Sequence, residues 1–146
     1  MSGPAETKTQ QEIAAIIKSI FAAFDEHDPG GIETHMHPDS TVWDVFTAQL
    51  IRGSEERKKF HKADQSQMQA RGTLSYEISE PVVDVWGTDT AIAKYYLSFE
   101  YQPPNATSGT VRITDVMRMI DGRWQVVHHH EGMVPEGVPP IDEPAP

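Results

Sequence analysis

The chain has 146 residues, which is the length of one domain of ordinary size. Its net charge of −10, from 22 acidic and 12 basic residues, argues against nucleic acid and anionic membranes as partners, because both require a basic surface. The chain has no cysteine and no apolar run of the roughly 20 residues that span a bilayer, which excludes disulfides, thiolate chemistry and a transmembrane helix.

The N-terminal half is predicted to be mainly helical. Residues 1–8 are polar, are expected to form a disordered tail, and lack the apolar segment of a secretory signal, so we expect a cytoplasmic protein. Apolar side chains at helical spacing predict a first helix from Thr9 to Asp25. A short helix is expected over residues 32–37, then the strand-like runs "TVWDVF" and "LIRG", and a third helix from Ser54, as its cap, to about Ala70.

The chain after Gly72 is predicted to form strands. The runs are "LSYEISEPVVDVW", "AIAKYYLSFEY", "TVRITDVMRMI" and "RWQVVHHHEG", and the Asp121-Gly122 pair between the last two is a strong hairpin signal. Residues 133–146 are rich in Pro and Glu and are expected to form an extended tail. Helices followed by an antiparallel meander indicate a single α+β domain over residues 9–132.

Three consecutive histidines near the end of the last strand are candidates for acid–base, metal-binding or structural roles. Side chains alternate across a strand, so Trp124, Val126, His128 and His130 are expected on one face, and Gln125, Val127, His129 and Glu131 on the other. The run therefore cannot act as one cluster. His128 and His130 would lie about 6.6 Å apart along the strand, and a zinc site would still need a third ligand. We expect no metal, with two of the three histidines structural or at a subunit interface.

The stretch "DSTVWDVFTAQLIRG" resembles the ketosteroid isomerase and polyketide cyclase-like (SnoaL-like) branch of the nuclear transport factor 2-like superfamily. "ITDVMR" is similar to a segment of the isomerase, and "DGRWQVVHHH" is similar to many members of the superfamily, including the association domain of calcium/calmodulin-dependent kinases. The resemblance covers most of residues 10–132. It implies a cone-shaped, curved antiparallel sheet wrapped around three N-terminal helices and enclosing an apolar pocket.

The resemblance also implies two catalytic carboxyl groups. Asp44 matches the position of the isomerase's general base, and Asp115 matches that of a protonated acid that donates a hydrogen bond to the developing enolate. Both lie among apolar neighbours, which raise the pKa of a carboxyl group. His129 is expected in the same pocket as proton donor or shuttle, and His61 is expected to point there from the third helix.

The chain departs from the isomerase at its tyrosines. The oxyanion tyrosine corresponds to Ile20, and two supporting tyrosines correspond to Met36 and His61. The remaining expected pocket and substrate-binding residues are apolar, aromatic or acidic: Trp43, Phe60, Tyr95, Phe99, Ile113, Met117, Val127 and Glu131.

These residues predict a cofactor-independent isomerase or lyase acting on a small apolar, aromatic or polycyclic substrate. Double-bond isomerisation, dehydration, cyclisation and retro-aldol cleavage all remain open as reactions. His128 and His130 are expected on the opposite face of the sheet, where such proteins dimerise, so we expect a homodimer. The alternative is a non-catalytic ligand-binding or oligomerisation module like the kinase association domain.

Overall fold

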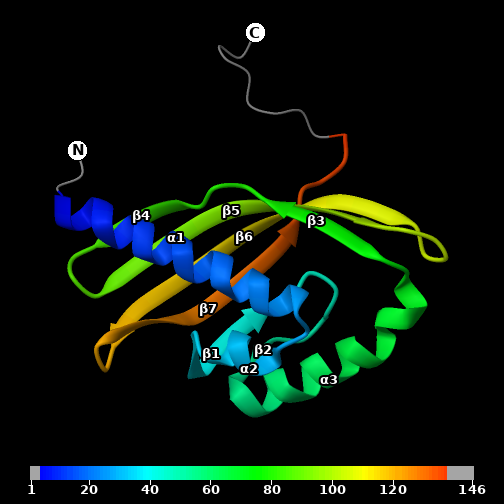
Figure 1. Cartoon of the computed structure of the whole chain (residues 1–146), viewed down its shortest axis with the longest axis horizontal. Coiled ribbons are helices and arrows are strands. Elements are labelled where there is room, and N and C mark those ends of the chain that lie inside the picture. The colour runs from blue at the N-terminus through cyan, green and yellow to red at the C-terminus, as the bar shows by residue number, and fades with distance from the viewer. Residues whose placement is uncertain (1–3, 138–146) are drawn as a thin grey trace, which may run out of the picture.

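The computed structural model describes residues 4–137 and places three helices and seven strands within them (Figure 1). None of these helices is long and apolar enough to cross a membrane. The helices are α1 Pro4–Asp25, α2 Pro29–Glu33 and α3 Gly53–Arg71, and the strands are β1 Met36–Trp43, β2 Ile51–Arg52, β3 Leu74–Ile78, β4 Val82–Trp86, β5 Thr90–Tyr101, β6 Thr107–Ile120 and β7 Arg123–Met133.

The seven strands form a single curved sheet with the order β2-β1-β7-β6-β5-β3, and β4 pairs with the first half of β5. The expected α+β architecture is confirmed, but the sheet is mixed rather than wholly antiparallel, because β1 runs parallel to β7. In Figure 1, α1 lies across β4 and β5, and α3 lies against β1 and β2. The helices therefore cover one face of the sheet, which we call the inner face.

Alternation along the strands separates the core from the outer face. On β5 and β6 the odd-numbered side chains face the helices, whereas even-numbered neighbours such as Lys94, Tyr96 and Arg112 are exposed. The buried inner-face side chains of these two strands are Ala91, Ala93, Tyr95, Phe99, Val111, Ile113, Asp115 and Met117. Asp115 is thus a charged residue in an otherwise apolar or aromatic layer.

Several predicted boundaries differ from the structure. The first helix begins at Pro4, five residues before the expected start at Thr9. The second helix occupies Pro29–Glu33 rather than residues 32–37, because a proline that would break a helix interior is well suited to its first turn. Residues 36 and 37 instead open β1, since pairing with β7 outweighs the local pattern. The expected cap at Ser54 is replaced by Arg52, whose backbone N–H donates to the Glu56 carboxylate.

The buried Arg57 side chain joins α3 to α2 and β1. Its guanidinium donates to both carboxylate oxygens of Glu33, at 2.7 and 2.9 Å, and to the Ser40 hydroxyl and carbonyl and the His37 carbonyl. A buried arginine is tolerated when its donors are paired in this way. The contact fixes the strand that ends immediately before Asp44.

Gly72 and Gly87 both have a positive φ, but only Gly72 also has backbone atoms too close to leave room for a Cβ. Gly72 has φ 89°, and a Cβ there would collide with the backbone carbonyls of Gln102 and Pro103, whereas Gly87 has φ 65° and open space around it. We expect Gly87→Ala to cost about 1 kcal/mol of unfolding free energy, and Gly72→Ala to cost at least roughly 2 kcal/mol more because the backbone must move. Urea denaturation measures both; equal losses would contradict the predicted contact.

Candidate functional site

A row of hydrogen-bonded side chains crosses the inner face of the sheet. Tyr95 comes from β5, Asp115 from β6, and His129 and Glu131 from β7, while Asp44 follows the end of β1. The pairing of the strands creates the row, because Asp115 lies directly opposite His129. Tyr95, Asp115 and Asp44 come from separate parts of the sequence, so the sheet brings them to the His129–Glu131 pair.

A β-bulge in β7 sets which histidine enters the row. The register shifts between Val116 and Met117, so that Val127 has no partner on β6. Simple alternation placed Val127 on the face of His129; the structure instead places the fully buried Val126 there. His128 points outward and its Nδ1 lies 2.7 Å from the Thr41 hydroxyl. His129 was expected to be the one histidine of the three that faces the interior, and this geometry agrees with that expectation.

His129 lies between two carboxylates. Its Nδ1 is 2.6 Å from Asp115 Oδ1 and its Nε2 is 2.8 Å from Glu131 Oε2. Burial would lower the pKa of His129, but the negative charge of Asp115 and hydrogen bonds to both carboxylates raise that pKa well above its ordinary 6.5. The imidazole is therefore protonated at neutral pH, and both ring N–H groups donate.

The Asp115 end of the row is closed. The Tyr95 hydroxyl donates to Asp115 Oδ2 at 2.6 Å, so both carboxylate oxygens accept hydrogen bonds. Burial and the charge of Asp115 raise the pKa of Tyr95 well above 10, which keeps the phenol protonated. The Asp115 side chain is 2% exposed. This is the geometry of an ion-pair partner, and it differs from the expected protonated donor.

The other end of the row carries two adjacent carboxyl groups with opposite pKa shifts. Burial followed by the charge of Glu131 raises the pKa of Asp44 to about 6, against 3.8 ordinarily. Burial would also raise the pKa of Glu131, but the hydrogen bond and charge of His129 lower it below 4.5. Asp44 also hydrogen-bonds Glu131. Near neutral pH Asp44 is therefore the carboxyl group that gains and loses a proton.

This end of the row is accessible to solvent. The side chains of His129 and Glu131 are 17% and 22% exposed, in contrast to Asp115. Aromatic rings lie nearby: Phe46, two residues after Asp44, makes an edge contact with Phe99 at a centroid distance of 5.9 Å. Phe99 in turn contacts Tyr101 at 5.9 Å. The accessible end therefore combines carboxyl groups with an aromatic wall.

Most of the other predicted site residues lie in the core, and Trp43 lies on the opposite face of the sheet. Tyr95, Phe99, Ile113, Met117 and Met36 are buried in the inner-face core, and Ile20 packs against it. Trp43 is 41% exposed and pairs with His130, so it lies on the outer face.

His61 and Phe60 are not part of the row. His61 contacts Phe60 and lines a small hollow of about 30 Å³ between α1, α2 and α3. Its Nε2 is buried without a hydrogen-bond partner among the described residues, and burial lowers its pKa. A larger hollow of about 320 Å³ lies between α1 and β4, and the row lines neither.

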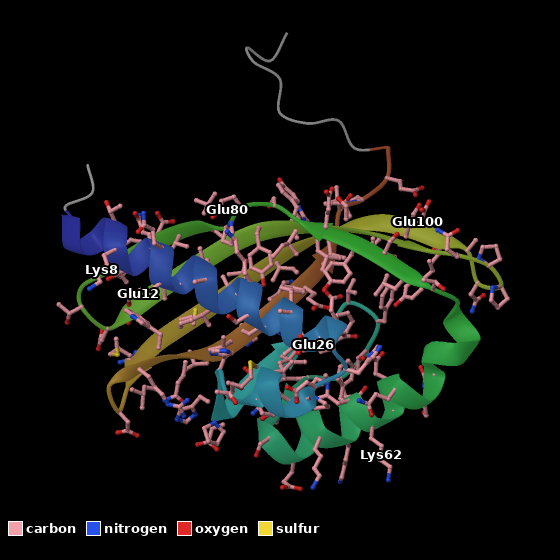
Figure 2. The ribbon with its side chains drawn as sticks, in the orientation of Figure 1. Lys8, Glu12, Glu26, Lys62, Glu80 and Glu100 are labelled. Atoms are coloured by element: carbon pink, nitrogen blue, oxygen red, sulfur yellow. The ribbon has the colours of Figure 1, made fainter. Side chains whose placement is uncertain are left out.

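Charged side chains on the outside are distinct from the row. Lys62 on α3 and Glu80 and Glu100 at the margin of the sheet project from the fold in Figure 2. Within the described residues no group of three or more His, Asp or Glu side chains is arranged to hold a metal ion.

Replacing Asp44 tests its raised pKa through stability. Because its folded pKa lies above its unfolded value, Asp44 stabilises the fold fully below pH 3.8, and this contribution is lost as the pH rises through about 6. Asn cannot ionise, so Asp44→Asn should be more stable than the wild type at pH 7.5, by on the order of 2 kcal/mol, and not at pH 4. Urea denaturation at both pH values measures this, with exposed Asp39→Asn as the matched control. An equal effect of Asp44→Asn at both pH values would contradict it.

Residues 9–135 match the family of the calcium/calmodulin dependent protein kinase II association domain. No curated protein sequence matches the chain. Among solved structures, a nuclear transport factor 2-like protein of unknown function from Pseudomonas putida KT2440 is 23% identical, with a TM-score of 0.74 over 86% of this chain and 87% of that one.

Two further structures extend the comparison. The association domain of C. elegans CaMKII is 19% identical, with a TM-score of 0.71 over 89% of this chain and 99% of that one. A candidate ketosteroid isomerase from Shewanella frigidimarina is 17% identical, with a TM-score of 0.69 over 81% and 92%. The predicted nuclear transport factor 2-like fold is confirmed, and the chain belongs to the calcium/calmodulin dependent protein kinase II association domain family.

Proposed function

We propose that the domain is a cofactor-independent acid–base catalyst of the isomerase or lyase type, with Asp44 as the group that takes up and returns a proton. The observation that carries the proposal is the pair of adjacent carboxyl groups whose pKa values shift in opposite directions. A separation of this kind gives two carboxyl groups different roles in one site. A general base with a pKa close to the working pH is the most effective kind.

His129 and Glu131 support Asp44 electrostatically in this proposal. Glu131 remains ionised beside His129, and its negative charge makes Asp44 a stronger base once ionised. The His129 cation is bound on both sides by Asp115 and Glu131, and its charge keeps Glu131 ionised. Tyr95 and Asp115 act as positioning residues that hold the imidazole in place.

The substrate proposed is small and apolar or aromatic, because the accessible end of the row adjoins the rings of Phe46 and Phe99. The proton that Asp44 removes from a carbon next to a carbonyl group would return to the same or another carbon, or accompany loss of a leaving group. Isomerisation, dehydration and aldol-type cyclisation begin with this step. In retro-aldol cleavage Asp44 would instead take the proton of the β-hydroxyl group, and the carbon–carbon bond would break to give the enolate. The likeness to the candidate ketosteroid isomerase supports the fold alone.

The proposal predicts exchange of carbon-bound hydrogen. A panel of cyclic ketones and β,γ-unsaturated ketones in D₂O should include one whose α-carbon gains deuterium, and the rate should rise with pH through about 6 as Asp44 ionises. Asp44→Asn should lower that rate by about 10²- to 10⁴-fold, while Asp39→Asn leaves it unchanged. Full exchange by the Asp44→Asn variant, measured by NMR, would exclude Asp44 as the base.

We also propose that the domain assembles with copies of itself through the outer face of the sheet. Its membership of an association-domain family and the exposed aromatic side chains of that face favour this second role. Tyr96 is 55% exposed on β5, and Trp43 is 41% exposed beside His130. Aromatic side chains are enriched at protein interfaces relative to the rest of a protein surface.

Light scattering tests this second role. Wild-type protein should have the mass of a homo-oligomer, a dimer at the least, and Tyr96→Arg should shift it toward the monomer because a charge would be buried in the contact. Lys58→Glu, an exposed change on α3, should leave the mass unaltered. A wild-type monomer at micromolar concentration would contradict it.

A further inference from the structure

Loop 44–50 connects β1 to β2 (Figure 1, teal), and its first residues lie beside Glu131 at the accessible end of the row. One contact ties its start to β7, and two more hold the turn that begins at Asp44 itself. The Val45 N–H donates to Glu131 Oε1 at 3.1 Å, and the Phe46 N–H and Thr47 hydroxyl donate to Asp44 Oδ2 at 3.0 and 2.9 Å. The Phe46 ring then reaches Phe99 on β5, which lies beyond β7 and β6 in the sheet.

The contact between Phe46 and Phe99 lies beside the level of Glu131 in the sheet. Glu131 is opposite Ile113 on β6, and Ile113 is opposite Tyr95 on β5, four residues before Phe99. This offset displaces the contact along the strands from Glu131, so the Phe46 ring holds the loop beside the accessible end of the row. Phe46 is nevertheless 65% exposed, so the loop lies on the surface and is retained by few contacts.

We propose that loop 44–50 is a lid controlled by one proton, closed while the Asp44 carboxyl group donates to Glu131 and loosened when both groups are carboxylates. This regulation rests on the proposed function of the same site. In the closed state one proton is shared between two carboxyl groups, and Glu131 also holds the Val45 amide. Loss of the proton replaces an attraction by a repulsion at the hinge of the loop.

The charges around Asp44 favour this response. On β7, Glu131 is its neighbour and is bound to the His129 cation, whose other carboxylate partner is Asp115 on β6. Tyr95 on β5 is neutral. From α3, which packs against β1, the Arg57 guanidinium is bound by Glu33. The cations closest to the row are thus already paired, so the repulsion between ionised Asp44 and Glu131 is not compensated by a further positive group.

The direction of the response follows from the raised pKa of Asp44. Below about pH 6 the shared proton is present and the lid is closed; above it the lid is loosened. The open state is then the state in which Asp44 is ionised and able to act as a base. Access to the site and the base form of the catalyst would appear together, because the same proton controls both.

Amide hydrogen exchange of Val45, whose N–H is bound by Glu131, tests the lid without any substrate. Protection factors, corrected for the intrinsic pH dependence of exchange, should fall about tenfold or more in the wild type between pH 5 and 7. Asp44→Asn should keep its protection at pH 7, because the Asn amide donates to Glu131 at every pH. Asp39→Asn, which removes the same charge from β1, should behave as the wild type. Wild-type protection that is constant from pH 5 to 7 would overturn the lid.

Thr47→Val provides a second, directional test that does not depend on the folding of the Asn variant. The Thr47 hydroxyl bonds the Asp44 carboxylate and lowers its pKa, so its loss should move the opening midpoint to higher pH, by about half a unit. A midpoint that stays in place or moves down would contradict proton control. Amide protection tests the lid, and deuterium incorporation into ketones tests the acid–base function. Because the two measurements are independent, one proposal can fail while the other is supported.

Discussion

The contact between protonated His129 and the carboxylates of Asp115 and Glu131 is the interaction on which the site depends. An unpaired charge would be costly at this depth, and each of the three groups makes the burial of the others tolerable. Glu131 also connects the ion pair to the segment that follows β1, because it accepts a hydrogen bond from the Val45 amide and adjoins Asp44. Tyr95 completes the row on β5. One ion-paired imidazole thereby couples four strands.

The β-bulge at Val127 is what makes this contact possible. Without the extra residue, the strand that buries Trp124 and Val126 would direct His128 and His130 inward. With it, His129 faces Asp115, and His128 is left to the outer face, where it meets Thr41. A run of three histidines would be ambiguous on a regular strand, and a single irregularity of the backbone selects which one is buried.

The sequence predicted the strands of the C-terminal half and the Asp121-Gly122 hairpin, because alternation and turn residues are local signals. The expectation for His129 came from the family resemblance, since alternation alone does not reveal the bulge at Val127. The sequence did not predict contacts between residues that are far apart along the chain. The parallel pairing of β1 with β7 could not be read from residues 36–43, which carry a proline and no clear alternation. The contact of Tyr95 with Asp115 depends on the register across the β5–β6 connection, which local patterns do not fix. His61 was expected in the pocket, but α3 turns it toward α1 and α2.

Family membership and site chemistry bear on different parts of the molecule. The association-domain family accounts for the fold and directs attention to the outer face, whereas the inner row carries the proposed acid–base chemistry. Carbon-13 NMR titration of the two carboxyl side chains at the accessible end tests the proposed chemistry. Asp44 should titrate at about 6 and Glu131 below 4.5. Titration of Asp44 near 3.8 would contradict it, because Asp44 would then be an ordinary surface carboxylate.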